Sequence, residues 1–174
     1  MEKYLASKKI YDGRAVNLRV DTVEKTSGTI TTREIVEHSD CIAVVVLDDK
    51  ENVIMVRQYR RPVGKVLLEI PAGGIEPGEE SEGCVKRELQ EEIGYFPKKV
   101  SRIGGFYAVP GYCTEFMHLF LASDLEKSRM VAEDTDEIEV VRIPLADIPQ
   151  MIERGEICDA KSIVGLLTVL QKSL

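Results

Sequence analysis

Apolar and polar residues alternate along residues 8–37 of the chain, and two turn signals, Asp12-Gly13 and Ser27-Gly28, interrupt the alternation. Alternation with a period of two is typical of a strand with one buried face. The pattern predicts two strands, residues 14–25 and 29–37, joined as a hairpin. This segment has few bulky apolar residues, so a small meander here needs another surface to pack against, and exchange with a second subunit is one solution.

Further along the chain, short apolar runs separated by turn residues predict a longer series of strands. The run at 42–47 pairs with the run at 53–58 across a polar turn at 48–52. The remaining predicted strands are 66–70, 100–107, 116–122 and 138–143. Helical periodicity predicts helices at 145–154 and 160–170, with Asp159 as the N-cap of the second. This order of strands and helices predicts an α/β sandwich with a mixed sheet.

The segment 73–95 joins a Pro/Gly-rich loop to an amphipathic stretch. Val85, Leu89 and Ile93 recur at four-residue spacing, so they would form one apolar stripe of a helix. Gly94 follows, and glycine is the usual residue in the left-handed conformation that ends a helix. The pattern therefore predicts a helix that packs this stripe into the core and ends at Gly94.

Three glutamates, Glu88, Glu91 and Glu92, stand at positions i, i+3 and i+4 beside the apolar stripe. Like charges at these spacings repel by about 0.2–0.5 kcal/mol per pair in water. A hard divalent cation would relieve the repulsion, because Mg²⁺ takes carboxylate oxygens and keeps positions for water and phosphate oxygens. The spacing predicts a Mg²⁺ site, with Mn²⁺ as the alternative cation. The competing interpretation is a solvated acidic helix face.

Composition narrows the class of protein. A chain of 174 residues is long enough for one domain that buries about 70% of its unfolded surface. Its net charge of −7 argues against sequence-independent binding of nucleic acid, which requires Lys and Arg opposite the phosphates. The start of the chain lacks a signal peptide, and the longest apolar run, 41–47, is too short to span a bilayer. With cysteines scattered singly, we expect a cytoplasmic protein without a membrane partner.

Several familiar motifs are missing from the sequence. It contains neither a Gly-x-Ser-x-Gly elbow nor a phosphate-binding Gly-Lys-Ser/Thr loop, which removes serine hydrolases and P-loop enzymes from consideration. No two Cys or His residues lie at the spacing of a zinc finger. His38 and His118 stand outside any motif, so we expect both to be structural.

The segment 73–95 resembles the signature of the Nudix hydrolases without a gap. The matching positions are Gly73, Glu79, Arg87, Glu88, Leu89, Glu91, Glu92 and Gly94. Tyr95 departs from the family's final aliphatic position. The resemblance implies hydrolysis of a nucleoside diphosphate linked to another group, on a mixed sheet between helices. It also implies a single domain over 1–174, with 1–38 as N-terminal strands that form a homodimer and 39–174 as the catalytic core.

The resemblance assigns roles within the signature. It implies that Glu88 and Glu92 are direct Mg²⁺ ligands and that Glu91 shares the metal or acts through water in catalysis. The carbonyl of Ala72 is implied as a backbone ligand. Glu79 and Arg87 are implied to form an ion pair that fixes the loop against the helix.

Other stretches resemble the ADP-ribose pyrophosphatase branch of the family. Pro110, fifteen positions past Tyr95, stands where that branch carries a proline. The plainer reading is a turn, since Pro-Gly marks turns in many proteins. Glu115 closes the same segment and is a further candidate for substrate binding.

Three more candidates for substrate binding rest on the same resemblance. Arg60, in the stretch Gln58-Tyr-Arg-Arg-Pro62, is implied to contact the substrate's phosphates. The alternative for the arginines of this stretch is a solubilising strand edge. Glu69, in the approach to the signature, is implied to lie near the ligand. Arg33 belongs to the strand that in this branch reaches the nucleotide and supports the dimer.

The acidic run 133–137 precedes the last predicted strand. By itself such a run is typical of a solvated loop. In the ADP-ribose branch a loop at this point delivers a glutamate that orients or deprotonates the attacking water, which makes Glu137 and Asp136 the candidates, with Glu133 a third.

We therefore expect a Mg²⁺-dependent Nudix hydrolase that cleaves ADP-ribose to AMP and ribose 5-phosphate. One alternative is a pyrophosphatase for nucleotide sugars such as GDP-mannose. The other is a Nudix domain that senses a nucleotide without hydrolysing it.

Overall fold

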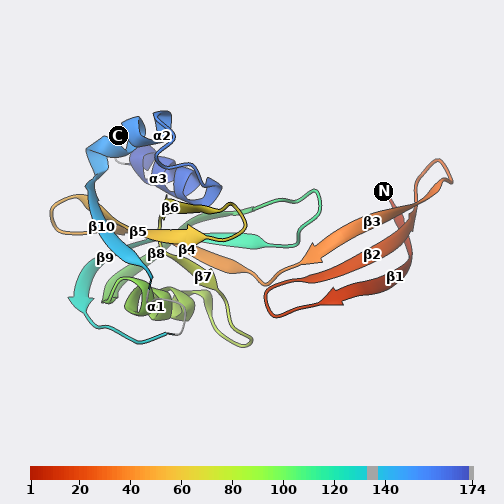
Figure 1. Cartoon of the computed structure of the whole chain (residues 1–174), viewed down its shortest axis with the longest axis horizontal. Coiled ribbons are helices and arrows are strands. Elements are labelled where there is room, and N and C mark those ends of the chain that lie inside the picture. Colours follow the sequence, from red (N-terminus) through yellow and green to blue (C-terminus); the bar gives the residue numbers. More distant parts are fainter. Residues whose placement is uncertain (133–136, 173–174) are drawn as a thin grey trace. The chain divides into compact units, whose positions relative to one another are not determined.

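The computed structural model describes residues 1–132 and 137–172, which fall into two compact units (Figure 1). The first unit consists of Met1–Asp40 and Tyr107–Phe116, and the second of Cys41–Phe106 and Met117–Leu174. Within the described ranges, the helices are all too short or too polar to cross a lipid bilayer.

The first unit is built on a three-stranded antiparallel sheet in the order β1(Lys3–Asp12), β2(Asn17–Glu24), β3(Ile30–Glu37). The predicted hairpin corresponds to β2 and β3, and the meander is confirmed. The strand β1 was not among the predicted strands. All ten of its residues are exposed, so its sequence lacks the one-sided apolar pattern from which strands are recognised.

Residues 107–116 of the first unit pack beside the end of β3. The amide of Val36 donates to the carbonyl of Tyr112 at 2.7 Å, and the amide of Thr114 donates to the carbonyl of Val36 at 3.0 Å. The rings of Tyr107 and Phe116 meet edge to face, with centroids 4.9 Å apart. The segment therefore forms an ordered part of this unit.

The second unit contains a seven-stranded mixed sheet covered by helices on both faces, which confirms the predicted α/β sandwich (Figure 1). The strand order is β10-β5-β4-β9-β8, with β6 added to β5 and β7 added to β4. The pair β4–β9 is parallel, whereas β4–β5 and β5–β10 are antiparallel. The bounds are β4(Cys41–Leu47), β5(Asn52–Arg60), β6(Lys65–Glu69), β7(Ala72–Gly74), β8(Tyr95–Tyr107), β9(Phe116–Lys127) and β10(Glu139–Pro144).

The position of strand β4 between two cores explains why its sequence is continuously apolar. Ala43 and Val45 face a core formed with the C-terminal helices α2(Ile148–Glu153) and α3(Ala160–Lys172). Ile42 and Val44 face a second core formed with α1(Ser81–Glu92). A strand buried on both faces cannot alternate with polar residues.

Two predicted elements differ from the structure. The predicted helix at 145–154 is a 3₁₀ turn, η1(Leu145–Asp147), followed by the short helix α2. Pro149 explains the break, because a residue without an N–H fits the first turn of a helix and not its interior. The predicted strand 100–107 begins at Tyr95 and includes Pro97. This proline is tolerated because β8 ends the strand order, where one side of its backbone needs no partner.

The helix α3 docks on the sheet through its first turns. Asp159 caps it as predicted, accepting the amide of Ser162 on Oδ2 at 3.2 Å. The fully buried hydroxyl of Ser162 accepts the amide of Ile70 at 2.8 Å. Gly165 keeps the approach close, since a Cβ there would lie 3.0 Å from Cδ1 of Ile70 and 3.2 Å from Cγ2 of Val45.

The buried Ser162–Ile70 hydrogen bond gives a test of this docking. We expect Ser162→Ala to lower the free energy of unfolding by about 1–3 kcal/mol, because it leaves a buried amide without an acceptor. Thr168→Ala in the same helix is the matched control, since the Thr168 hydroxyl is exposed and donates within the helix to the Val164 carbonyl. Urea denaturation measures both, and equal losses would contradict the role of Ser162.

Candidate active site

The helix α1 carries the candidate site and forms as its apolar spacing predicts. Val85 and Leu89 are fully buried and Ile93 is 4% exposed, so the stripe packs on the face of the sheet that α1 covers. Gly94 has φ +77°, the left-handed conformation expected after the end of the helix. The stripe fixes the rotation of the helix and thereby the direction of its glutamates.

A close approach of strand β7 to α1 explains the first glycine of the signature. β7 pairs with β4, and at Gly73 its backbone lies against the carboxylate of Glu88. A Cβ on Gly73 would stand 2.0 Å from both Cδ and Oε1 of Glu88. Only glycine leaves room for this carboxylate.

The predicted ion pair between Arg87 and Glu79 is present. Nε and Nη2 of Arg87 donate to the two carboxylate oxygens of Glu79, each at 2.9 Å. This bidentate hydrogen bonding lowers the pKa of Glu79. Nη2 also donates to the carbonyl of Gly74 at 3.1 Å, so one guanidinium joins the loop to the helix.

Arg87 also reaches the metal-ligand candidates. Its Nη1 donates to Oε1 of Glu88 at 2.7 Å and to Oε2 of Glu91 at 3.3 Å. This contact offsets part of the repulsion among the glutamates. Even so, burial raises the pKa of Glu88, with Arg87 acting in the opposite direction.

Glu92 is the most buried of the three glutamates, with 6% of its surface exposed. Its Oε2 accepts the amide of Ala72 at 3.2 Å, which anchors β7 to the end of α1. Burial, reinforced by the charge of Glu88, raises the pKa of Glu92 to about 8. A carboxylate in this position is stabilised by a positive charge beside it.

The donors at this site fit a hard divalent cation. Glu88, Glu91 and Glu92 offer carboxylate oxygens, the ligands that Mg²⁺ and Mn²⁺ prefer. The nearby Cys84 is buried and donates its thiol to the carbonyl of Gly74 at 3.3 Å. Burial raises the pKa of this thiol, so it stays protonated and does not act as a thiolate ligand.

A second group of charges surrounds Glu69 at the end of β6. Nε and Nη2 of Arg60 donate to Oε2 of Glu69 at 2.9 and 2.5 Å. Nζ of Lys161 lies 3.2 Å from the same oxygen and 2.9 Å from Oδ2 of Asp159. Burial acts to lower the pKa of Arg60, but the hydrogen bond and charge of Glu69 raise it above its ordinary value. Arg60 therefore stands in an ion-pair network and not on a solubilising strand edge.

The sequence identified Arg60 and Glu69 but not Lys161. Lys161 lies about a hundred positions from Arg60 in the sequence, outside every motif. The one local signal was the predicted N-cap Asp159, which places the first turn of α3, and hence Lys161, at a definite point on the sheet.

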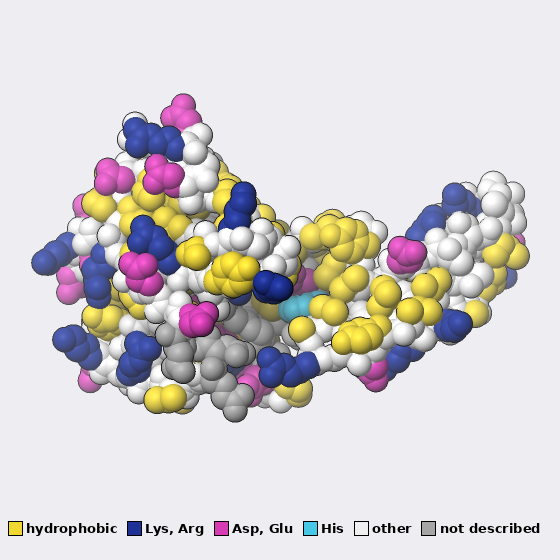
Figure 2. All heavy atoms as spheres, in the orientation of Figure 1, with side chains coloured by type: hydrophobic (Ala, Val, Ile, Leu, Met, Phe, Trp, Pro, Cys, Tyr) yellow, Lys and Arg dark blue, Asp and Glu magenta, His cyan; other side chains and the backbone are white. Residues whose placement is uncertain are grey.

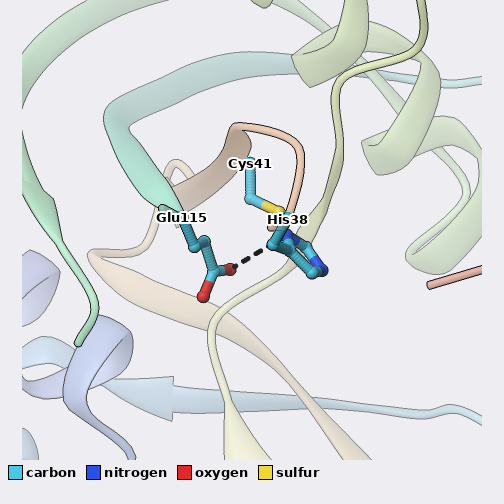
Figure 3. A group of neighbouring side chains, drawn as sticks. All are labelled: His38, Cys41 and Glu115. Atoms are coloured by element: carbon cyan, nitrogen blue, oxygen red, sulfur yellow. Dashed lines mark ion pairs between the residues drawn. The ribbon is translucent and has the colours of Figure 1, made fainter. Parts of the chain in front are cut away.

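Three predicted substrate-binding residues, Arg33, Pro110 and Glu115, belong to the first unit. Arg33 lies in β3 and forms an ion pair with Glu2. Pro110 is exposed in a turn closed by the amide of Cys113, which donates to the carbonyl of Val109 at 2.9 Å. The carboxylate of Glu115 lies 3.9 Å from Nδ1 of His38, toward which it points (Figure 3).

One candidate for positioning water, Glu137, lies in the described part of the chain just before β10. Glu137 is exposed and stands two residues before that strand. Asp136 and Glu133 lie outside the described residues.

Comparison with known proteins places the chain in a family. The model of the NUDIX domain matches residues 37–163, so the chain belongs to the Nudix family, which confirms the resemblance of its signature. An ADP-ribose pyrophosphatase of Bacillus subtilis (strain 168) is 41% identical over 168 residues, which are 95% of this chain and 90% of that protein.

Other relatives have different names. A methanol dehydrogenase activator of Bacillus methanolicus is 36% identical and covers 95% of this chain and 90% of its own length. A GDP-mannose pyrophosphatase of Citrobacter koseri is 31% identical over 90% of this chain and 87% of its own. Among solved structures, one described as an ADP compounds hydrolase aligns with a TM-score of 0.90 over 98% of this chain and 92% of that one. At 21% identity it shows the same fold.

The contact between Gly73 and Glu88 provides a test of the site. We expect Gly73→Ala to displace the Glu88 carboxylate and to weaken Mn²⁺ binding by about 10- to 100-fold, as changes that disturb ligand orientation do. Calorimetric titration with Mn²⁺ measures the effect. Gly83→Ala, in α1 itself, is the control, because its Cβ would lie 3.8 Å from the nearest atom and would favour the helix. Equal affinities in the two variants would contradict the assignment.

Proposed function

We propose that this protein is a metal-dependent pyrophosphohydrolase that cleaves ADP-ribose to AMP and ribose 5-phosphate. The observation that carries the proposal is the locked arrangement of β7 and α1, in which Glu88 packs on Gly73 and Glu92 binds the Ala72 amide. The identity with the Bacillus subtilis ADP-ribose pyrophosphatase over nearly the whole chain supports the choice of substrate. The scattered single cysteines fit action in the reducing cytoplasm.

In this proposal Glu88 and Glu92 hold Mg²⁺ directly, with the Ala72 carbonyl as a backbone ligand, and Glu91 shares the metal or binds its water. A cation bound there would neutralise the charge that develops on the phosphate oxygens. Arg87 holds Glu88 and Glu91 in place, because its guanidinium is itself fixed by Glu79. Mn²⁺ would serve the same donors.

Arg60 would bind the diphosphate. Its two hydrogen bonds to Glu69 use Nε and Nη2, so Nη1 and the second N–H of Nη2 remain as a forked donor for phosphate oxygens. Glu69 orients Arg60 in this role. Arg33, Pro110 and Glu115, all in the first unit, stay further candidates for substrate binding.

Hydrolysis requires one water molecule, whose oxygen forms a bond to one phosphorus while the bridging P–O bond breaks. The departing phosphate takes the electron pair, and the water's proton passes to a carboxylate. We assign this proton transfer to Glu137 or Asp136; Glu137, the described one, is exposed and stands two residues before β10.

GDP-mannose is the second candidate substrate, because it has the same diphosphate and a relative bears the name GDP-mannose pyrophosphatase. A sensing domain without turnover is the third. A domain that only binds a nucleotide does not need all the signature glutamates. This chain keeps Glu88, Glu91 and Glu92, which favours an enzyme.

Product analysis tests the proposal. Incubation with Mg²⁺ and a panel of ADP-ribose, NADH, GDP-mannose, UDP-glucose and diadenosine polyphosphates should yield AMP and ribose 5-phosphate from ADP-ribose. We expect Glu92→Gln to lower kcat/KM by on the order of 10²- to 10³-fold, because a bound metal contributes several kcal/mol to stabilising the transition state.

Glu82→Gln is the control for charge, since Glu82 lies exposed in the first turn of the same helix. It should retain the activity of the unmodified protein. Preference for GDP-mannose would overturn the substrate and keep the chemistry, and binding of ADP-ribose without cleavage would favour the sensing domain.

The first unit supports a homodimer. Its strands expose large apolar side chains: Tyr4, Leu5, Ile10, Tyr11 and Ile30 are each at least 41% exposed. Figure 2 shows hydrophobic side chains gathered along this sheet. A patch of this kind is typical of a surface that a second subunit covers, and we propose that β1–β3 form the dimer interface.

A charge placed in this patch tests the interface. We expect Ile10→Asp to convert a dimer to a monomer in light scattering coupled to size-exclusion chromatography, because association would bury the carboxylate without a partner. Leu167→Asp places the same charge on an exposed apolar position of α3 and should leave the mass unchanged. If the unmodified protein is a monomer, the proposed dimer interface is wrong.

A further inference from the structure

One carboxylate oxygen in the second unit is shared by two cations. Oε2 of Glu69 accepts both hydrogen bonds of the Arg60 guanidinium and lies 3.2 Å from Nζ of Lys161. Glu69 is 2% exposed, so this oxygen is shielded from solvent. Ionic contacts in such surroundings are screened far less than those on the surface.

The position of Lys161 is itself fixed by the fold. It stands in the first turn of α3, whose cap Asp159 binds the amide of Ser162 and the ammonium of Lys161 with the same oxygen, Oδ2. Ser162 in turn binds the amide of Ile70, the residue directly after Glu69. The start of α3 is therefore joined to the Glu69 strand through backbone and side chain together.

The geometry points to Lys161 as a positioning residue for Arg60, acting through Glu69, in the binding of the substrate's diphosphate. This inference rests on the proposed function, in which Arg60 binds phosphate. Lys161 does not touch the substrate in this role. It contacts the same oxygen of Glu69 that Arg60 uses, and it shares the negative charge that would otherwise act on Arg60 alone.

The charges of the network explain why Lys161 matters. Arg60, Lys161, Glu69 and Asp159 together carry no net charge. The positive charges of Arg60 and Lys161 also act on the carboxylate of Glu92. Removal of the Lys161 ammonium leaves one uncompensated negative charge next to the place where a diphosphate would bind. Such a charge weakens binding of a polyanion without removing any group that contacts it.

Steady-state kinetics with ADP-ribose test the inference. Lys161→Met should raise KM about tenfold, the factor that corresponds to one charge-assisted hydrogen bond, while kcat stays within about twofold because no group at the metal changes. Lys161→Arg keeps the charge and should restore KM to within about threefold of the unmodified value. Lys172→Met, which removes the same charge from the exposed last turn of α3, should have no effect.

Three outcomes would overturn the role. A fall in kcat with unchanged KM would place Lys161 in the chemical step. If Lys161→Arg does not restore KM, the positive charge is not the cause of the effect. If Lys172→Met raises KM equally, the effect comes from the overall charge of the protein. Should Lys161→Met not fold, Lys161→Gln tests the same loss of charge with a side chain that still donates a hydrogen bond.

A double-mutant cycle tests whether Lys161 acts through Glu69. In a Glu69→Gln background, Lys161→Met should change KM by less than about twofold, because the Glu69 carboxylate that links Lys161 to Arg60 is already gone, although Asp159 still pairs with Lys161. Independent effects, with the two fold-changes multiplying, would contradict action through Glu69.

An NMR readout separates this inference from the proposed function. The Nε–H resonance of Arg60, assigned by its loss in Arg60→Lys, should shift in Lys161→Met and stay in place in Lys172→Met. An unchanged resonance in Lys161→Met overturns the positioning role, whether or not ADP-ribose is cleaved. A shifted resonance in a protein that cleaves no member of the panel supports the network and counts against the proposed function.

Discussion

The candidate site depends on one close contact, the approach of the β7 backbone to the glutamates of α1. Gly73 admits the Glu88 carboxylate where any Cβ would collide with it, and the neighbouring amide of Ala72 binds Glu92. The two contacts bring neighbouring residues of β7 against two glutamates one helical turn apart. Arg87 completes the arrangement by binding Glu79 and the Gly74 carbonyl, so the loop between strand and helix has little freedom. The sequence spacing between Gly73, Glu79 and the Arg87–Glu92 segment is thus the spacing that these contacts require.

The same contact places carboxylates where they are unfavourable in the absence of a cation. Burial raises the pKa of Glu88 and of Glu92, and only Arg87 approaches Glu88 closely from within the described part of α1. Burying these carboxylates lowers the free energy of unfolding, so other contacts in the unit must compensate. The packing of β4 is the evident source of that stability. Its side chains fill two cores at once, one against α1 and one against α3. Apolar packing on β4 therefore holds α1 against the sheet, although repulsion among the glutamates of α1 acts against this packing.

The sequence predicted those parts of the molecule whose physical cause is local. The α1 stripe, its end at Gly94, the Asp159 cap and the Arg87–Glu79 pair all follow from spacing, conformation or complementary charge, and the structure has each of them. It did not predict β1, whose ten residues are exposed and therefore lack a pattern, or the break at Pro149. The role of Lys161 was not predicted, because the Asp159 cap locates the first turn of α3 but its contact with Glu69 depends on α3 returning to that strand after a long stretch of chain. Such contacts are set by tertiary packing and leave no periodic mark.

Under the proposed function, the described site of the second unit would recognise features that several substrates share. Glu88, Glu91 and Glu92 suit a cation, and Arg60 with its partners suits a phosphate, whereas none of these groups distinguishes one base or sugar from another. ADP-ribose and GDP-mannose both present a diphosphate to such residues. Relatives of similar sequence do bear different substrate names, and the choice of base must rest on residues outside this set. In a protein with a net charge of −7, attraction of a diphosphate would fall to these few local cations. Their exact placement, which Glu69 and the start of α3 control, would then govern affinity more than the field of the whole molecule does.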